Sequence, residues 1–338
     1  MQDLSCVIGI DGGATQTRGI LTDPEGRIRA RLKAPGTNYH HTGLQDTANL
    51  LYSMCMELLK QAGREPDSLR AVCMGLAGAG RPADRQRLHG QISPLFSQET
   101  LLLETDASIA LHGGCLSKEG VLVIAGTGSI VYGQNTDRMT ARVGGYGPIL
   151  SDDGSGYAIA RAGLRAIMLA RDGMAPSTMI RDKILRRLFL QSEDDIVEWT
   201  MNPQTDKAAI AQLASVVFES LVEGDETARK IIQDAADVFG RAVQCVAGKL
   251  NLSEPFAAVL TGGIIEHNEV YFDLVKEEIQ VRLPGAEVIH PILQPVKGAV
   301  LKALEALDIP IQETLIANLK ESETSGESGT NITEAEWA

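Results

Sequence analysis

The chain has 338 residues, of which 44% are hydrophobic and 4% aromatic, and its formal net charge is −13. This acidic excess argues against a broad nucleic-acid-binding surface, which needs a basic stripe to neutralise phosphates. It does not exclude the binding of one nucleotide, because backbone amides and a metal ion can do that locally. The length allows two domains.

Cysteine usage and the apolar segments suggest where the protein resides. The five cysteines are scattered and include no Cys-x-x-Cys pair, so neither a disulfide framework nor a zinc site is expected. The first residues lack a signal-peptide pattern. No window approaches the roughly 20 apolar residues of a transmembrane helix. We therefore expect a cytoplasmic protein with no membrane partner.

The first elements read as three strands joined by short turns. Apolar residues predict strands at 6–10 and 17–22, and alternation predicts a third at 27–33. Asp-Pro-Glu-Gly at 23–26 has the residues of a type I turn. Short connections of this kind predict an antiparallel meander.

The following segments alternate between helices and strands. Helical spacing is seen at 44–62, 81–92 and 106–114, with strands at 71–76 and 100–104 between them. A strand at 121–125 then meets a small-residue turn and a second strand at 130–135. This repeats the pattern of the first strands, and the repetition predicts a duplicated fold.

The remainder of the chain is expected to be mostly helical. Residues 157–249 read as helices with a break near 200–206. Beyond them we expect strands at 257–260 and 286–290 and helices at 268–283 and 296–307. The polar C-terminal residues predict a disordered tail.

Asp11-Gly12-Gly13-Ala14-Thr15 follows the first strand. Glycines let backbone amides turn toward an anion, and Thr15 adds a hydroxyl. Asp11 could hold Mg²⁺ directly or through water. A plain hairpin loop with an incidental aspartate is the alternative.

Gly126-Thr127-Gly128-Ser129 has the same chemistry in the second half of the chain. Neither turn is a Rossmann loop or a P-loop, because both of those connect a strand to a helix. A second turn of the same type strengthens the interpretation that both bind phosphate.

Asp106 lies between a predicted strand and a predicted helix. A carboxylate there can accept a proton from a hydroxyl nucleophile. It can also serve as a helix N-cap, and the local residues favour the cap.

Two further glycine-rich segments have both structural and functional interpretations. Residues 144–157 combine glycines, Tyr146, Asp152 and Asp153, which suits a polyol ligand or an acidic helix start. Gly262-Gly263 follows a strand and permits a flat approach of a base or ribose, although the local residues favour a tight turn.

In order and spacing, these segments resemble the N-acetylglucosamine kinases of the BadF/BadG/BcrA/BcrD-type ATPase family, over roughly residues 7–307. The resemblance implies an α/β fold of two RNase H-like (actin-like ATPase) domains, each a mixed five-stranded sheet flanked by helices, with a cleft between them. The implied domains are 1–118, with a C-terminal helix at about 296–318 packing back on it, and 119–295. The implied disordered tail is 319–338.

The resemblance also implies roles for individual residues. Asp106 matches the catalytic base that activates the 6-hydroxyl of the sugar, and Asp11 is implied to lie near Mg²⁺. The residues implied to bind ATP are Asp11, Gly12, Gly13, Thr15, Gly126, Thr127, Gly128, Gly262 and Gly263. The residues implied to bind the sugar are Asn38, Gly78, Asp106, Gly145, Tyr146 and Asp152.

The implied reaction is ATP-dependent phosphorylation of a hexosamine, N-acetylglucosamine first, with glucosamine and N-acetylmuramic acid as alternatives. Ala14, Ala77 and Tyr146 differ from the residues that are usual at these positions in the family, and these differences leave the choice of sugar open. A nucleotide switch that hydrolyses ATP to drive a partner is the alternative from another class. The family's iron–sulfur activators are disfavoured, because no cysteine here has the expected context. A homodimer is also expected from the resemblance.

Overall fold

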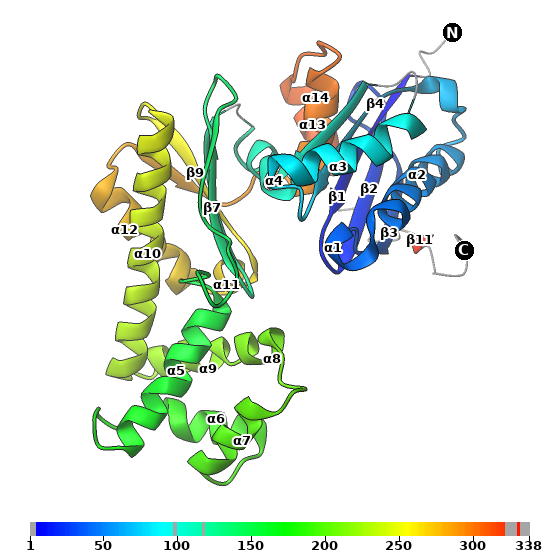
Figure 1. Cartoon of the computed structure of the whole chain (residues 1–338). Coiled ribbons are helices and arrows are strands. Elements are labelled where there is room, and N and C mark those ends of the chain that lie inside the picture. The colour runs from blue at the N-terminus through cyan, green and yellow to red at the C-terminus, as the bar shows by residue number, and fades with distance from the viewer. Residues whose placement is uncertain (1–4, 97–99, 117–118, 322–329, 332–338) are drawn as a thin grey trace. The chain divides into compact units, whose positions relative to one another are not determined.

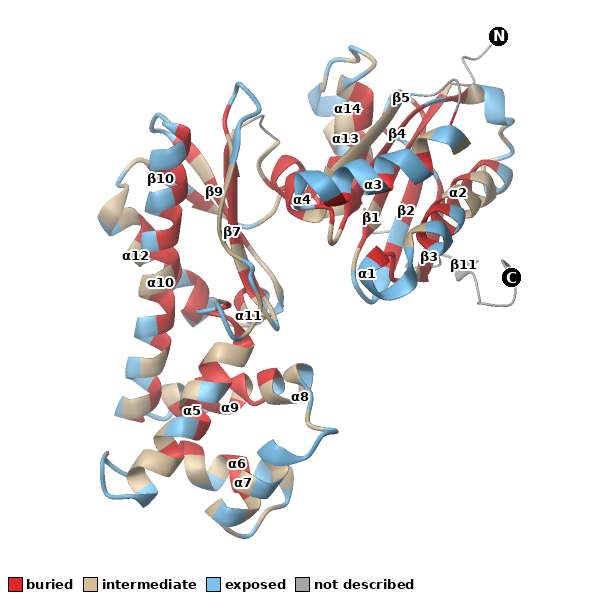
Figure 2. Cartoon of the chain, in the orientation of Figure 1, coloured by how far each residue is buried: buried red, intermediate tan, exposed pale blue. Residues whose placement is uncertain are grey.

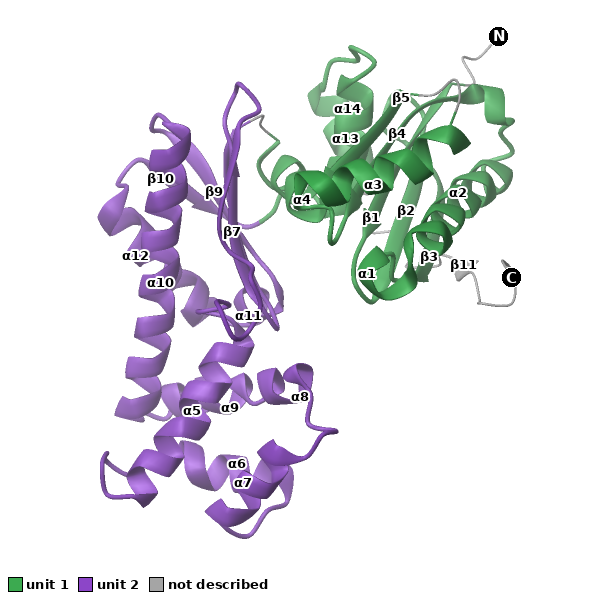
Figure 3. Ribbon diagram, in the orientation of Figure 1, with its two compact units in different colours: residues 1–118, 291–338 green, residues 119–290 purple. Residues whose placement is uncertain are grey.

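The computed structural model describes residues 5–96, 100–116, 119–321 and 330–331 (Figure 1). The chain divides into two compact units (Figure 3). Unit 1 comprises residues 1–118 with 291–338, and unit 2 comprises residues 119–290. Each unit contains one mixed sheet with flanking helices, which confirms the expected fold class.

The sheet of unit 1 begins with the predicted meander. Its strands are β1 (Cys6–Gly12), β2 (Gln16–Thr22), β3 (Ile28–Pro35), β4 (Leu69–Leu76), β5 (Thr100–Thr105) and β11 (Thr330–Asn331). Their order is β11-β3-β2-β1-β4-β5. β1, β2 and β3 pair antiparallel, whereas β4 and β5 run parallel to β1. The two-residue β11 extends the expected five strands to six.

Helices lie on both faces of this sheet. They are α1 (Tyr39–Thr42), α2 (Leu44–Gln61), α3 (Pro82–Ile92), α4 (Asp106–Cys115), α13 (Pro295–Glu305) and α14 (Glu313–Glu321), with 3-10 turns η1 (Pro66–Ser68) and η2 (Ser93–Leu95). Along β1, Ile8 packs in the cluster with α2 and α3, and Val7 packs in the cluster with α13. Because successive side chains of a strand point to opposite faces, a strand buried on both faces is a continuous apolar run.

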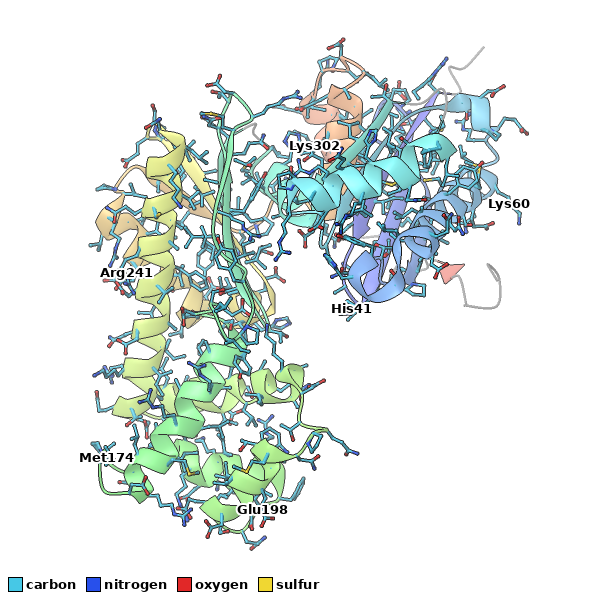
Figure 4. All side chains as sticks on the ribbon, in the orientation of Figure 1. His41, Lys60, Met174, Glu198, Arg241 and Lys302 are labelled. Atoms are coloured by element: carbon cyan, nitrogen blue, oxygen red, sulfur yellow. The ribbon has the colours of Figure 1, made fainter. Side chains whose placement is uncertain are left out.

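The C-terminal part of unit 1 differs from the expected single helix at about 296–318. Two helices are present, separated by a segment in which Asp308 has φ +57° and Pro310 follows, a combination that ends a helix. Lys302 of α13, labelled in Figure 4, donates to Glu104 of β5 at 3.3 Å.

The expected tail boundary at residue 319 is also wrong. Leu319 is buried, and α14 continues to Glu321. Beyond that helix the structure describes residues 330–331, which pair with β3, and the other residues of the expected tail lie outside the described part of the chain.

The sheet of unit 2 repeats the topology of unit 1. Its strands are β6 (Gly120–Ala125), β7 (Ser129–Gln134), β8 (Thr140–Gly144), β9 (Phe256–Thr261) and β10 (Ala286–Ile289). The order β10-β9-β6-β7-β8 has the same antiparallel and parallel pairs as β5-β4-β1-β2-β3. The predicted duplication is therefore confirmed. β8 was not predicted, because it is short and half-exposed and shows no clear alternation.

Eight helices of the described chain belong to unit 2. They are α5 (Gly156–Arg171), α6 (Ile180–Leu188), α7 (Glu193–Met201), α8 (Lys207–Gln212), α9 (Ala214–Val222), α10 (Glu226–Leu250), α11 (Gly263–Glu266) and α12 (Glu269–Arg282). The predicted break near 200–206 is present between α7 and α8. α10 runs alongside the sheet, and its buried residues, red in Figure 2, belong to the same core cluster as those of the strands.

Candidate active site

The first group of candidate residues lies at one edge of the unit 1 sheet. Because β1, β4 and β5 are parallel, their carboxyl ends share this edge. The register pairs Asp11 with Gly75 and Gly75 with Glu104, and Asp106 begins α4 directly after β5. Two carboxylates that are far apart in the sequence therefore meet at the edge where open α/β sheets bind ligands.

The pKa values of these two carboxyl groups reflect their surroundings. Burial and, after it, the neighbouring Asp106 carboxylate raise the pKa of Asp11 to about 6, against a smaller lowering by Arg18. Burial also raises the pKa of Asp106, although the Ala107 N–H works against this. Carboxyl groups with raised pKa values are suited to exchange protons near neutral pH.

Asp106 is not the N-cap of its helix, contrary to the structural interpretation that the local sequence favoured. Thr105 is the cap, and its hydroxyl accepts from the Ser108 N–H at 3.0 Å. Asp106 is the first helical residue, and its Oδ1 accepts from the Ala107 N–H at 2.8 Å. Because Thr105 provides the cap, Asp106 is not needed for that role.

The turn at Gly13-Ala14-Thr15 is a tight hairpin between β1 and β2, as the structural interpretation expected. The Gly13 N–H donates to the Gln16 carbonyl at 3.0 Å, and the Thr37 N–H donates to the Gly13 carbonyl at 3.1 Å. A Cβ on Gly12 would lie 2.3 Å from the Thr37 hydroxyl oxygen, so a larger residue would not fit. Thr15 is exposed at the tip. A hairpin of this shape remains compatible with phosphate binding.

Asn38 and Gly78 come together near this turn. Asn38 caps α1 by accepting from the His40 N–H at 3.2 Å. Gly78 has φ +88°, and a Cβ there would lie 2.9 Å from the Asn38 Oδ1. Since L residues other than glycine rarely adopt this conformation, glycine is what leaves the Asn38 amide accessible.

In unit 2, Gly126, Thr127 and Gly128 form the turn between β6 and β7. The Gly126 N–H donates to the Gly128 carbonyl at 2.9 Å, and the Gly156 N–H donates to the Gly126 carbonyl at 2.8 Å. The Ser129 hydroxyl donates to the Asp153 carbonyl at 2.8 Å. These bonds join the turn to the loop that precedes α5.

Asp152 is central to that connection. It is only 4% exposed and has φ +71°. Its Oδ1 accepts from the Ser129 N–H at 3.4 Å, and its Oδ2 accepts from the Lys207 ammonium at 2.6 Å. Of the two interpretations of this segment, the acidic helix start is wrong, because Ser155 caps α5 and both aspartates precede the cap. Asp152 thus contacts the glycine turn that was expected to bind phosphate.

Gly145 and Tyr146 lie on an exposed loop after β8. Tyr146 is 54% exposed, and the Arg142 guanidinium carbon lies 4.7 Å from the centre of its ring. The Tyr146 N–H donates to the Ser151 hydroxyl at 2.9 Å, which folds the loop back toward Asp152. Beneath this loop is a pocket of about 190 Å³, with walls that include Tyr146, Leu150 and Asp152.

Gly262 follows β9 and lies against the strand that leads into the second glycine turn. Its φ is +101°, and a Cβ there would lie 2.4 Å from the Ala125 carbonyl oxygen. Gly263 is exposed at the start of α11. Thr261 and the Gly262 N–H both donate to the Glu266 carboxylate, at 2.5 and 2.9 Å. The turn interpretation is therefore correct, and this turn abuts the candidate phosphate turn.

Asp11 is the residue that was expected to lie near Mg²⁺. Within the described residues there is no group of three or more His, Cys, Asp or Glu side chains that could hold an ion. Mg²⁺ keeps several waters and needs only one or two carboxylates together with substrate phosphates. The half-buried Asp11 carboxylate fits that requirement.

Sequence reasoning missed Lys207, which contacts Asp152 from 55 residues further along the chain. It begins a short helix, and nothing in its local sequence distinguishes it from a solvent-exposed lysine. Thr37 was also missed, although it adjoins Asn38.

Comparisons with known proteins agree with the motifs. A model of the BadF/BadG/BcrA/BcrD ATPase family matches residues 8–303. An N-acetyl-D-glucosamine kinase of Dictyostelium discoideum is 32% identical over 88% of this chain and 98% of its own. An N-acetylmuramic acid/N-acetylglucosamine kinase of Clostridium acetobutylicum is 30% identical over 89% of this chain and 99% of its own.

A solved structure supports the fold. The crystal structure of a protein from Chromobacterium violaceum has a TM-score of 0.67 at 22% identity, covering 88% of this chain and 99% of that one. In the described residues, no helix has the length and apolar character needed to cross a bilayer. The resemblance that the motifs indicated is confirmed.

Proposed function

Because the chain belongs to the BadF/BadG/BcrA/BcrD ATPase family, we propose that it is an ATP-dependent kinase that phosphorylates an amino sugar. The expected acceptor is the 6-hydroxyl of N-acetylglucosamine. The observation that carries the proposal is the pair of carboxylates at one sheet edge, with Asp106 half-buried and held through one oxygen. Full-length relatives named as kinases of this sugar support the choice of reaction.

In this proposal Asp106 is the catalytic base. It accepts the proton of the sugar hydroxyl, whose oxygen attacks the γ-phosphorus of ATP. The bond from that phosphorus to the β-phosphate oxygen breaks, and ADP leaves. A raised pKa makes Asp106 a stronger base than an ordinary carboxylate, while positioning and charge stabilisation supply most of the rate.

The nucleotide is bound by glycine turns in this proposal. Gly12, Gly13 and Thr15 in unit 1 and Gly126, Thr127 and Gly128 in unit 2 contact the phosphates, and Gly262 and Gly263 contact the adenosine. Asp11 would hold Mg²⁺, which would neutralise charge on the phosphates. The tight turns, and the glycines that place no side chain in them, support the assignment.

The sugar is bound by Asn38, Gly78, Gly145, Tyr146 and Asp152 in this proposal. The proximity of Asn38 to Gly78 supports the first two. The exposed ring of Tyr146 supplies an apolar face for the N-acetyl group. Asp152 accepts one bond on each oxygen, from Ser129 and from Lys207, and each oxygen keeps a further lone pair that can accept from a sugar hydroxyl.

The test is a mass-spectrometric screen of sugar acceptors with ATP and Mg²⁺. We expect a mass gain of one phosphate on N-acetylglucosamine, and the panel includes glucosamine and N-acetylmuramic acid. Phosphorylation of one of those sugars instead would change the acceptor but not the reaction. Steady ATP hydrolysis with no phosphorylated sugar would contradict the proposal and favour a nucleotide switch.

A homodimer and a cytoplasmic location also stay predictions. Light scattering after size-exclusion chromatography measures the mass in solution, for which we expect twice the 36.2 kDa of one chain. Fractionation of source cells tests the location.

A further inference from the structure

A lysine that the motifs did not include lies against the second glycine turn. Lys207 is the first residue of α8, and its ammonium is 2.6 Å from the Asp152 Oδ2. A Cβ on Gly128 would lie 3.0 Å from this ammonium and 3.0 Å from the same carboxylate oxygen. Because Gly128 has no side chain, the Lys207–Asp152 ion pair can pack directly against the turn.

The two charges of this pair differ in their access to a ligand. The Asp152 side chain is 4% exposed, whereas the Lys207 side chain is 34% exposed. The carboxylate is further engaged by the Ser129 N–H at 3.4 Å. An ammonium has three N–H donors, and only one is needed for Asp152. The positive member of the pair is thus the one that an anion at the turn can reach.

We infer that Lys207 binds the polyphosphate of ATP at the second glycine turn; this rests on the proposed function. Its ammonium donates a charge-assisted hydrogen bond to a phosphate oxygen while the buried Asp152 holds the side chain in place. Lys207 then supplies, from 80 residues away, the positive charge that the backbone amides of Gly126–Gly128 lack.

A purely structural role for Lys207 makes a different prediction. A buried carboxylate without a partner is costly, so Lys207 could serve only to neutralise Asp152. In that case a variant that lacks both charges would bind polyphosphate at the turn as tightly as the wild type does. If Lys207 contacts phosphate, removing both charges leaves the nucleotide without its cation.

The experiment compares four purified proteins: the wild type, Lys207→Met, Asp152→Asn and the double variant. Calorimetry measures the Kd of ATP and of tripolyphosphate with no sugar present. We expect Lys207→Met to weaken both ligands roughly 10- to 100-fold, as loss of a charge-assisted bond does. The double variant should stay equally weak. Asp152→Asn keeps the cation and an amide oxygen that can accept from it, so it should bind within a few-fold of the wild type.

Two controls accompany this cycle. Lys207→Arg keeps the charge and should recover most of the affinity. Lys183→Met removes a lysine with the same 2.6 Å ion pair, to Glu223, elsewhere in unit 2, and should bind as the wild type does. Thermal unfolding shows whether each variant is folded, and the double variant avoids leaving a buried charge unpaired.

These binding experiments can overturn the inference about Lys207 without overturning the proposed kinase function, and the reverse is also possible. Wild-type affinity in Lys207→Met, or its recovery in the double variant, overturns the inference but not the kinase. Polyphosphate binding that depends on Lys207, without phosphorylation of any sugar, supports the inference while the proposed function fails. A wild type that binds neither ligand overturns both.

Discussion

At the scale of single residues, Asp106 carries the proposed chemistry. Asp106→Asn keeps the size and the hydrogen bond from Ala107 but removes the base, so kcat should fall roughly a hundred- to ten-thousand-fold. The Kd of ATP should be nearly unchanged. Steady-state kinetics and calorimetry measure the two quantities, with the exposed Asp67→Asn as the matched control. A kcat within a few-fold of the wild type would rule out Asp106 as the base.

Asp11 gives a prediction on pH and stability. Its pKa of about 6 in the folded protein exceeds the roughly 3.9 of an unfolded aspartate, so the folded state holds the proton more tightly. The stabilisation by that proton is complete below about pH 4 and is lost as the pH rises through about 6. At pH 7.5 the ionised carboxylate therefore destabilises the fold.

Asp11→Asn should accordingly raise the free energy of unfolding at pH 7.5 by roughly 1–3 kcal/mol. The advantage should shrink at pH 5.5, because the wild type then regains its proton in the folded state. Urea denaturation at both pH values measures the difference. An equal difference at the two pH values would show that the pKa of Asp11 is not raised.

At the scale of elements, two glycines near the second turn should respond differently to the same change. In Gly262→Ala the new Cβ would meet the Ala125 carbonyl at 2.4 Å on a backbone with φ +101°, so stability should fall by at least about 2 kcal/mol. In Gly126→Ala no atom lies within 4 Å of the Cβ, so stability should change by less than about 0.5 kcal/mol.

The Gly126→Ala variant then tests phosphate binding without the complication of a damaged fold. Its methyl group would enter the open space beside the turn that is proposed to bind phosphate, so we expect the Kd of ATP to rise while denaturation curves stay unchanged. Chemical denaturation and calorimetry on both variants check the contrast. Unaltered ATP affinity in Gly126→Ala would remove Gly126 from the proposed nucleotide site.

At the scale of the whole molecule, unit 1 depends on a segment from the far end of the chain. α13 packs directly on β1, where a Cβ on Gly9 would lie 2.6 Å from the Val296 carbonyl oxygen. Val300, Leu301 and Leu304 are among its buried side chains. Each buried aliphatic side chain stabilises a fold by about 1.5–3 kcal/mol, so losing several exceeds the total stability of a typical domain.

A chain truncated after His290 should therefore lose unit 1 although it keeps β1 to β5. Hydrogen exchange should show unprotected amides in residues 5–116 and protected ones in the helices and strands of 119–290. A chain truncated after Glu321 keeps α13 and α14 and serves as the control. Protected β1 amides in the shorter chain would contradict this dependence.

Local sequence patterns are sufficient to predict much of the fold. The apolar run of β1, the turn residues at 23–26 and the helical spacing of α2 each act within a few residues, so the meander and most helices were predicted. Features that depend on tertiary contacts were not. β8 is half-exposed and becomes a strand by pairing with β7, and α14 is held by the burial of Leu315 and Leu319.

The two glycine turns, the repeated strand pattern and the candidate acidic residues could be identified from the amino-acid sequence alone, because these features are local or repeat along the chain. Tertiary contacts were needed to show that Thr105 and not Asp106 caps α4, that burial and the neighbouring Asp106 raise the pKa of Asp11, and that Lys207 pairs with Asp152. Parallel pairing brings the first two carboxylates to one edge, and the packing of α8 near the second turn places the lysine. The energy of a charged side chain depends on its distance from other charges and on its burial, and the amino-acid sequence gives neither quantity directly.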